Sequence, residues 1–258
     1  MDTMSAGGKA SILVALAQNL VTASYTGPIF QLRRSGDDSL GDFYADSFGR
    51  LSLGSGGTGT PLLAWLGNAT AYVAVWYDQS GNGRHATQTV TSLQPKYSTI
   101  YGYVDFKPSA YMLMVASSVP PGNGVYSYVT RVNAINNANG GVFGIGNNAY
   151  SQGINLRRDT SRYFESWYNN DFGFGAYAPG NIVSETYDQT NRRGYVNGAL
   201  QSTQASSNRN GGTSLAYLGK TTADTTLNGE LYYLFTSSMV LSDADRSRLE
   251  TWPSTGII

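Results

Sequence analysis

The sequence is divided into short apolar stretches that end in turn residues, spaced about 8 to 12 residues apart. This spacing is the strongest restriction on the fold of the chain. Residues 70–78 read TAYVAVWYD, which is apolar on both alternating faces, and SGNG follows shortly afterwards. Such a stretch is typical of a central strand that is covered on both sides. Two further short strands flank Asn197-Gly198, a dipeptide that accepts the positive φ angles of a type I′ hairpin turn. The pattern predicts an all-β sandwich of about a dozen strands.

The remaining elements are predicted from the same apolar and turn signals. Further strands are expected at 29–32, at 101–116 around a turn at 107–109, at 124–135, at 140–146 and at 228–241. One short amphipathic helix is expected over 9–23, and a second over 242–252, with Ser242 as its N-cap and Pro253 as its stop signal. Because no repeat or linker interrupts the pattern, we expect one domain over 1–258 that begins with a helical segment over 1–24.

Composition excludes several classes of function. The 258 residues include no cysteine, which rules out disulfides, thiolate metal sites and cysteine nucleophiles. Only 13% of the residues are charged and the formal net charge is zero, so the chain has no basic footprint for nucleic acid. No stretch reaches 18 apolar residues, and no signal peptide is recognised, so no membrane insertion is expected. The expected location is a virion or the cytoplasm.

Four stretches in order resemble the concanavalin A-like jelly-roll sandwich in its laminin-G-like branch. They are DQSGNGRHATQ (78–88), VDFKPSAYMLMV (104–115), GYVNGAL (194–200) and LNGELYYLFTSSMVLSDADRSRLE (227–250). The N-terminal third is similar to the catalytic sandwich of fungal-type α-L-arabinofuranosidase B enzymes, on SYTGPIFQLRRSGDDS (24–39) followed by WYDQSGNGRHATQ. The first resemblance implies a concanavalin A-like β-sandwich with short terminal helices. The second implies a retaining glycosidase with a carboxylate nucleophile and a carboxylate acid/base.

The nucleophile position of the arabinofuranosidase pattern is not filled in this sequence. In that family the nucleophilic glutamate is followed directly by Asn-Asn, whereas here Asn169-Asn170 is preceded by Tyr168. Glu165 lies nearby but is out of step by three residues. Within a strand, an odd shift turns a side chain to the opposite face of the sheet.

The acid/base position is displaced as well. The family's aspartate follows an L-G-x-G-G run, whereas here residues 218–222 read LGKTT and Asp224 comes one place late. No catalytic residue is therefore assigned, and Glu165 and Asp224 are the fallback candidates. A retaining mechanism would need its two carboxyl groups about 5–5.5 Å apart.

The stretch 163–177, YFESWYNNDFGFGAY, combines aromatic rings with amide and carboxylate groups. Sugars are recognised by aromatic faces that stack on the ring and by polar groups that bind hydroxyls. The candidate glycan-binding residues are Trp167, Tyr168, Asn169, Asn170 and Asp171. The alternative is that these aromatic residues fill the core of the sandwich.

The turn after residue 77 offers a partial calcium motif. Asp78, Ser80 and Asn82 occupy positions 1, 3 and 5 of a calcium-loop pattern, but position 12 is Thr89 in place of the bidentate glutamate. The favoured interpretation is that Asp78 accepts backbone N–H bonds from the turn. His85, the single histidine, is expected to be a hydrogen-bond donor within this loop.

Together these observations favour a non-catalytic module without a cofactor. The expected function is glycan binding or structural attachment, as in a capsid-associated virion protein of a large DNA virus or phage. Its partners would be a glycan or other assembly proteins, in a homo-oligomer or on a capsid. The alternative is a retaining glycoside hydrolase of the α-L-arabinofuranosidase type.

Overall fold

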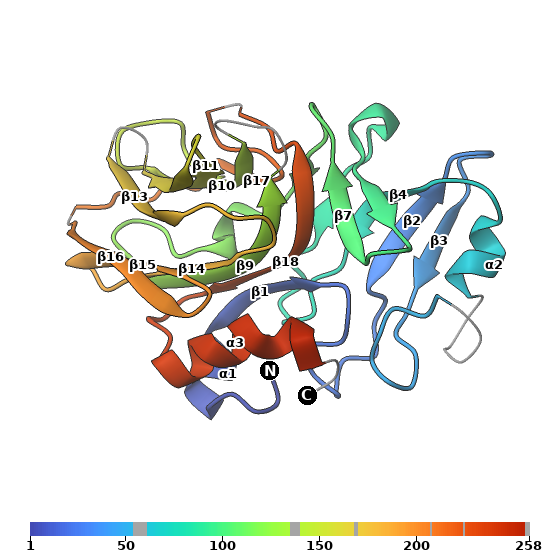
Figure 1. The fold of residues 1–258 in the computed structure, drawn as a ribbon, viewed down its shortest axis with the longest axis horizontal. Helices are drawn as coiled ribbons and strands as arrows, with labels where there is room; N and C mark the ends of the chain where they lie inside the picture. The colour runs from blue at the N-terminus through green and yellow to red at the C-terminus, as the bar shows by residue number, and fades with distance from the viewer. Residues whose placement is uncertain (54–60, 135–139, 168–169, 207, 224, 256–258) are drawn as a thin grey trace.

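The computed structural model describes residues 1–53, 61–134, 140–167, 170–206, 208–223 and 225–255, and these residues form a β-sandwich with few short helices (Figure 1). The predicted all-β sandwich is confirmed, although the described residues hold eighteen strands in place of about a dozen. All pairings between these strands are antiparallel. We name the two layers after a central strand of each, the β18 sheet and the β10 sheet.

The β18 sheet has the order β16-β15-β14-β9-β18, and the free edge of β18 pairs with β1 along one half and with β7 along the other. Its strands are β1 (Ile12–Ala17), β7 (Tyr103–Phe106), β9 (Tyr126–Ala134), β14 (Ile182–Tyr187), β15 (Asn191–Val196), β16 (Ala199–Ala205) and β18 (Gly229–Ser237). Asn197 and Gly198 turn the β15–β16 hairpin with φ angles of 50° and 82°, as the predicted type I′ turn requires.

The β10 sheet has the order β13-β12-β11-β10-β17-β8-β5-β4-β2-β3. Its strands are β2 (Phe30–Arg34), β3 (Leu40–Phe43), β4 (Ala71–Trp76), β5 (Ala86–Thr87), β8 (Met112–Leu113), β10 (Gly141–Gly146), β11 (Gly153–Arg158), β12 (Arg162–Ser166), β13 (Asp171–Ala176) and β17 (Leu215–Leu218). A short strand, β6 (Lys96–Ser98), pairs with both β4 and β7 and so joins the two sheets. The helical elements are α1 (Ala6–Ser11), α2 (Leu62–Leu66), α3 (Asp243–Thr255) and the 3₁₀ turns η1 (Thr91–Leu93) and η2 (Ala116–Ser118).

The core lies between the two sheets and is rich in aromatic rings. The ring of Tyr128 on β9 meets Phe143 on β10 edge to face, with centroids 5.0 Å apart, and both side chains are buried. Trp76 at the end of β4 is fully buried, and its indole N–H donates to the carbonyl of Ala17 on β1 at 3.1 Å. The core aromatics therefore hold the sheets together and also fix the turn that follows Trp76.

The predicted helix over 9–23, and with it the helical segment over 1–24, is wrong. The helix is confined to Ala6–Ser11, and Ile12–Ala17 is a strand paired with Tyr233–Ser237 of β18. All residues of this strand except Leu13 are buried. An apolar run that is buried on both faces has no period that distinguishes a strand from a helix, so the surrounding sheet decides.

The C-terminal helix begins as predicted but ends later. The Ser242 hydroxyl oxygen accepts a hydrogen bond from the Asp245 backbone N–H at 3.1 Å, which is the expected N-cap. The helix then continues to Thr255, so Pro253 does not stop it. A proline disfavours the helical conformation of the residue before it without excluding it. Asp245 also accepts bonds from Ser5 at 2.8 and 2.6 Å, which ties α3 to the start of α1 beneath the sheet (Figure 1).

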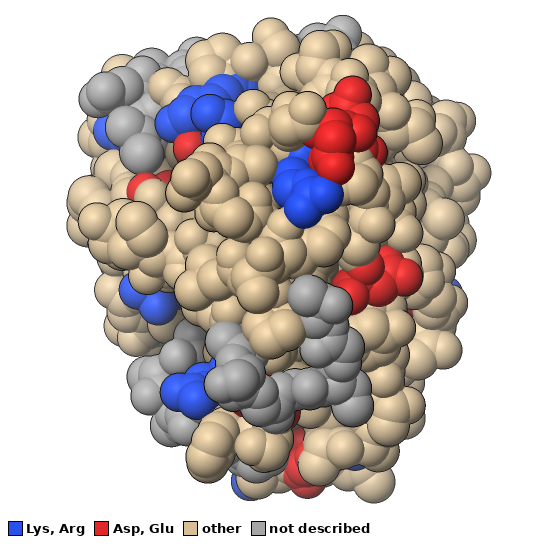
Figure 2. All heavy atoms as spheres, turned by 90° about the vertical axis from the view of Figure 1, so that its right-hand side faces the viewer, with Lys and Arg blue, Asp and Glu red and all other residues tan. Residues whose placement is uncertain are grey.

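Charged side chains form no dominant patch on the face that Figure 2 shows, where small acidic and basic groups are scattered among uncharged residues. This distribution matches the zero formal net charge of the sequence. Within the described part of the chain, no helix is both long and apolar enough to cross a membrane.

Candidate functional site

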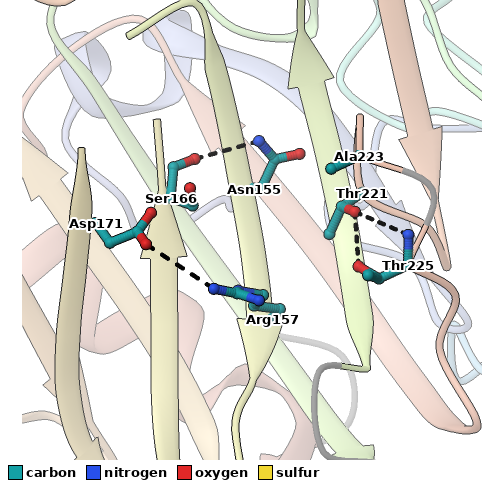
Figure 3. Close-up of a pocket in the computed structure, with 7 residues that line it drawn as sticks. All are labelled: Asn155, Arg157, Ser166, Asp171, Thr221, Ala223 and Thr225. Atoms are coloured by element: carbon teal, nitrogen blue, oxygen red, sulfur yellow. Dashed lines mark hydrogen bonds and ion pairs between the residues drawn. The ribbon is translucent and has the colours of Figure 1, made fainter. Parts of the chain in front are cut away.

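An open pocket of about 160 Å³ lies on the outer face of the β10 sheet (Figure 3). Residues on β11, β12 and β13 form its floor, and the segment that follows β17 forms one wall. Its lining is polar: Asn155, Arg157, Ser166, Asp171, Thr221, Ala223 and Thr225. Asp171 contributes the one carboxylate among these lining residues, and an oxygen of it lies 3.9 Å from a guanidinium nitrogen of Arg157.

The wall of the pocket is fixed to the floor by Asn155, which is 3% exposed. Its Oδ1 accepts hydrogen bonds from the backbone N–H and the hydroxyl of Thr222 at 2.7 and 2.9 Å, and its Nδ2 donates to the carbonyl of Ser166 at 3.2 Å. The hydroxyls of Thr221 and Thr225 bond each other at 2.7 Å and close the wall segment on itself. One buried amide thus connects the wall to two strands of the floor.

Two glycines of β10 allow the wall segment to lie directly on the sheet. A Cβ atom at Gly144 would stand 2.5 Å from both Asn155 Oδ1 and Thr222 N, and one at Gly141 would meet Thr221 and Thr225. No motif in the sequence pointed to Asn155, Arg157 or the wall threonines. The available signal was the glycine-rich stretch GGVFGIG (140–146), because glycine within a strand often marks the close approach of another backbone segment.

Glu165, a fallback catalytic candidate, lies on the opposite face of β12 from the pocket and is fully buried. Its Oε2 accepts a bond from Arg192 at 2.7 Å, and the Tyr126 hydroxyl donates to its Oε1 at 3.4 Å and to Glu185 at 2.7 Å. A catalytic carboxyl must reach the substrate. Ser166 lines the pocket, and neighbouring residues of a strand point to opposite faces. Glu165 therefore points away from the pocket and cannot reach a ligand there.

Burial dominates the electrostatics of this internal cluster. It raises the pKa of Glu165 to about 7, although the charge of Arg192 acts in the opposite direction. Burial, together with the negative charge of Glu165, raises the pKa of Glu185 well above its ordinary range. These carboxyl groups are part of the core, and their titration affects stability.

Trp167 does not present a face to a ligand, which corrects its assignment as a glycan-binding residue. Its side chain is fully buried, its indole N–H donates to the Tyr126 hydroxyl at 3.0 Å, and the Arg192 guanidinium lies 4.1 Å from its ring. The alternative interpretation, that aromatics of this stretch fill the core, describes Trp167 correctly.

The other candidate glycan-binding residues of this stretch differ in where the structure places them. Tyr168 and Asn169 lie outside the described residues, and so does Asp224. Asn170 accepts bonds from Arg192 through its backbone and side-chain oxygens, at 3.1 and 3.2 Å. Asp171 alone among the candidates that the structure describes faces the pocket.

The partial calcium motif forms a hydrogen-bonded turn. Asp78 is 2% exposed, and its two oxygens accept bonds from the backbone N–H groups of Ala15, Ser80 and Arg84 and from the Ser80 hydroxyl, at 2.8–3.0 Å. Asn82 donates to backbone carbonyls of β1. Among the described residues, no three His, Asp or Glu side chains gather as a metal site. Asp78 therefore ties the turn to β1.

The hydrogen bond that His85 makes in this turn is one that it accepts, whereas a donor was expected. Its Nδ1 accepts a hydrogen bond from the backbone N–H of Asp78 at 3.0 Å, and its ring meets Tyr77 edge to face. The histidine thus binds a backbone N–H just after the end of β4.

Comparison with solved structures defines the class of fold. An arabinofuranosidase complexed with arabinofuranosyl-α-1,2-xylobiose superposes with a TM-score of 0.69 at 16% identity, and a GH54 α-L-arabinofuranosidase soaked with a cyclic sulfate inhibitor superposes with 0.66 at 16%. Each alignment covers 93% of this chain and 61% of the other. At this identity the likeness shows the fold alone, which is the β-sandwich of these arabinofuranosidases.

Curated relatives are found by sequence over a shorter region. The chain is 30% identical over 87 residues to a probable α-L-arabinofuranosidase B of Aspergillus fumigatus, and 31% identical over 87 residues to the α-L-arabinofuranosidase B of Emericella nidulans. These matches cover 34% of this chain and 16% of each relative. No family model matches the chain.

These likenesses correct the functional expectation. The chain is similar in sequence and in fold to arabinofuranosidases, so the main interpretation as a non-catalytic virion or structural protein is wrong. The finer likeness to concanavalin A-like lectins stays a prediction.

Proposed function

We propose that this chain is a glycoside hydrolase that acts on α-L-arabinofuranosides, with the sugar bound in the pocket around Asp171. One observation carries this proposal. The pocket brings together residues from the two stretches, 163–172 and 218–225, in which the arabinofuranosidase resemblance locates its nucleophile and its acid/base. The similarity to arabinofuranosidases supports the same chemistry.

In this proposal Asp171 supplies one catalytic carboxylate and Asp224 the second. The chain neighbours of Asp224, Ala223 and Thr225, both line the pocket wall opposite Asp171. One carboxyl group protonates the departing glycosidic oxygen, while the other attacks the anomeric carbon or activates water. A guanidinium nitrogen of Arg157 lies 3.9 Å from the Asp171 carboxylate and places a positive charge beside it. Asn155 maintains the geometry by fixing the wall to the floor.

The test is hydrolysis of 4-nitrophenyl α-L-arabinofuranoside by the parent and by Asp171→Asn and Asp224→Asn. We expect each substitution to lower kcat by at least about 100-fold, the lower range of general acid–base contributions. Asp243→Asn is the matched control, because that carboxylate is 90% exposed on α3 and should leave kcat unchanged. Turnover that survives both pocket substitutions would refute the assignment.

The stereochemistry of the product gives a second readout. NMR of the first-formed arabinose distinguishes retention from inversion of the anomeric centre. Retention is expected if the two carboxyl groups work about 5–5.5 Å apart, as in the enzymes that the sequence resembles.

A further inference from the structure

A row of paired residues crosses the outer face of the β10 sheet beyond the pocket of Asp171. Residues paired across neighbouring strands share a face, so the row can be followed through the strand register. It begins at Asp171 and passes through Ser166, Asn155, Gly144, Tyr217, Leu113 and Thr87 to Val75. The row joins the first pocket to a region of β4 and β5 that the proposed function does not use.

A second cavity of about 440 Å³ lies at the far end of this row. Val75, Thr87 and Leu40 contribute apolar surface to it, and Gln31 and Thr89 contribute amide and hydroxyl groups. It is larger than the pocket around Asp171, which measures about 160 Å³. Its aliphatic walls can pack against the C–H groups of a neutral ligand, and its amide and hydroxyl groups can bind the hydroxyls of that ligand.

The charged residues of this cavity are already paired with each other. Arg33 donates to Asp38 at 2.5 Å and to Gln94 at 2.6 Å, and its guanidinium lies 4.5 Å from the ring of Tyr72. Gln94 in turn donates to the backbone carbonyl of Gln88 at 2.8 Å. Because these groups satisfy one another, the cavity is preorganised and offers no net charge for an ionic ligand.

The distance between the two sites limits what can occupy both. Five strand spacings separate β11, the nearest floor strand of the first pocket, from β4, which at about 4.8 Å per spacing amounts to about 24 Å. A single monosaccharide cannot span that length. Leu113, which is 48% exposed, lies on the sheet between the two sites.

We propose that the second cavity binds the main chain of a neutral polysaccharide whose arabinofuranosyl branch lies in the pocket of Asp171. This inference rests on the proposed function for the identity of the branch, but the cavity itself can be tested without catalysis. It makes the substrate a branched polymer, held at two places on one sheet face.

The experiment compares Thr87→Arg, which fills the second cavity, with the matched control Leu200→Arg, which adds the same charge at a 54% exposed position on β16 of the other sheet. Each variant and the parent are run through native gels that contain soluble arabinoxylan, and through gels without it. We expect the polysaccharide to retard the parent and Leu200→Arg, and Thr87→Arg to lose at least about tenfold in affinity. Gln31→Ala, a milder change in the same cavity, should weaken retardation if Thr87→Arg fails to fold.

Kinetics separate this inference from the proposed function. With an active parent, we expect Thr87→Arg to lower the ratio of kcat/KM on arabinoxylan to kcat/KM on 4-nitrophenyl α-L-arabinofuranoside by about tenfold, because the small substrate does not reach the second cavity. If the parent is inactive, the proposed function fails, and the gels still decide on the cavity. A parent that is not retarded, or equal retardation of all variants, would overturn the inference.

Discussion

Replacing Gly144 by alanine tests whether the pocket depends on the close approach between β10 and the wall segment. The added Cβ would stand 2.5 Å from Asn155 Oδ1 and from Thr222 N, where the two hydrogen bonds of the wall are made. If the wall lifts away, two bonds worth about 1 kcal/mol each are lost. If it stays, overpacking costs about 1–3 kcal/mol. Both routes predict a loss of about 2 kcal/mol in the free energy of unfolding.

For a chain of this size, that loss lowers Tm by about 4 to 8 °C, which thermal unfolding followed by circular dichroism can measure. Hydrolysis should suffer more, since misplacing a catalytic group by about 1 Å can cost 100-fold in rate. Gly36→Ala is the matched control, because a Cβ there meets no atom within 4 Å and its φ is not positive. Equal stability and equal turnover in the two variants would refute this account of the wall.

Two further predictions concern the buried polar groups. Asp78→Asn should lower the free energy of unfolding by about 3 kcal/mol in urea titrations, since an amide cannot accept bonds on both sides as the carboxylate does. A chelator should leave the Tm of the parent unchanged. A rise in Tm with calcium would restore the metal-site hypothesis. The second prediction concerns Glu165 and Glu185, whose pKa values are raised in the folded protein. Above a pH of about 4.3 these carboxyl groups lose their protons in the unfolded chain but keep them in the folded chain. The free energy of unfolding should therefore fall from pH 5 to 7, by up to about 1.4 kcal/mol per pH unit for each proton. Glu185→Gln should reduce this slope, and an unchanged slope would contradict the assigned burial effect.

Turns and helix ends could be predicted from the sequence where a residue type is required by the local backbone conformation or by a backbone hydrogen bond. Asn197-Gly198 required positive φ angles, and Ser242 offered a hydroxyl for an N-cap, so both the hairpin and the start of α3 were predictable. Residues 12–17 were not, because an apolar run without a polar face carries no period. Their strand conformation depends on an edge of β18, more than 200 residues further along the chain.

The site was less predictable, because it depends on register between distant strands. Glu165 and Asp171 stand six residues apart, yet only the β12–β13 pairing places one in the core and the other in the pocket. Asn155 belongs to no local motif, because its hydrogen-bond partner Thr222 lies 67 residues further along the chain. The aromatic stretch around Trp167 had two interpretations, and composition alone could not choose between core and ligand.

A crystal structure of Asp171→Asn soaked with 4-nitrophenyl α-L-arabinofuranoside would show whether the sugar binds in the pocket around residue 171. We expect an intact arabinofuranosyl ring in the pocket, in contact with Ser166 on the floor and Thr221 on the wall. Its glycosidic oxygen should lie within hydrogen-bond reach of residue 171 or 224. A sugar bound elsewhere on the sandwich, or an empty pocket at saturating substrate, would refute the assignment of this pocket as the catalytic site.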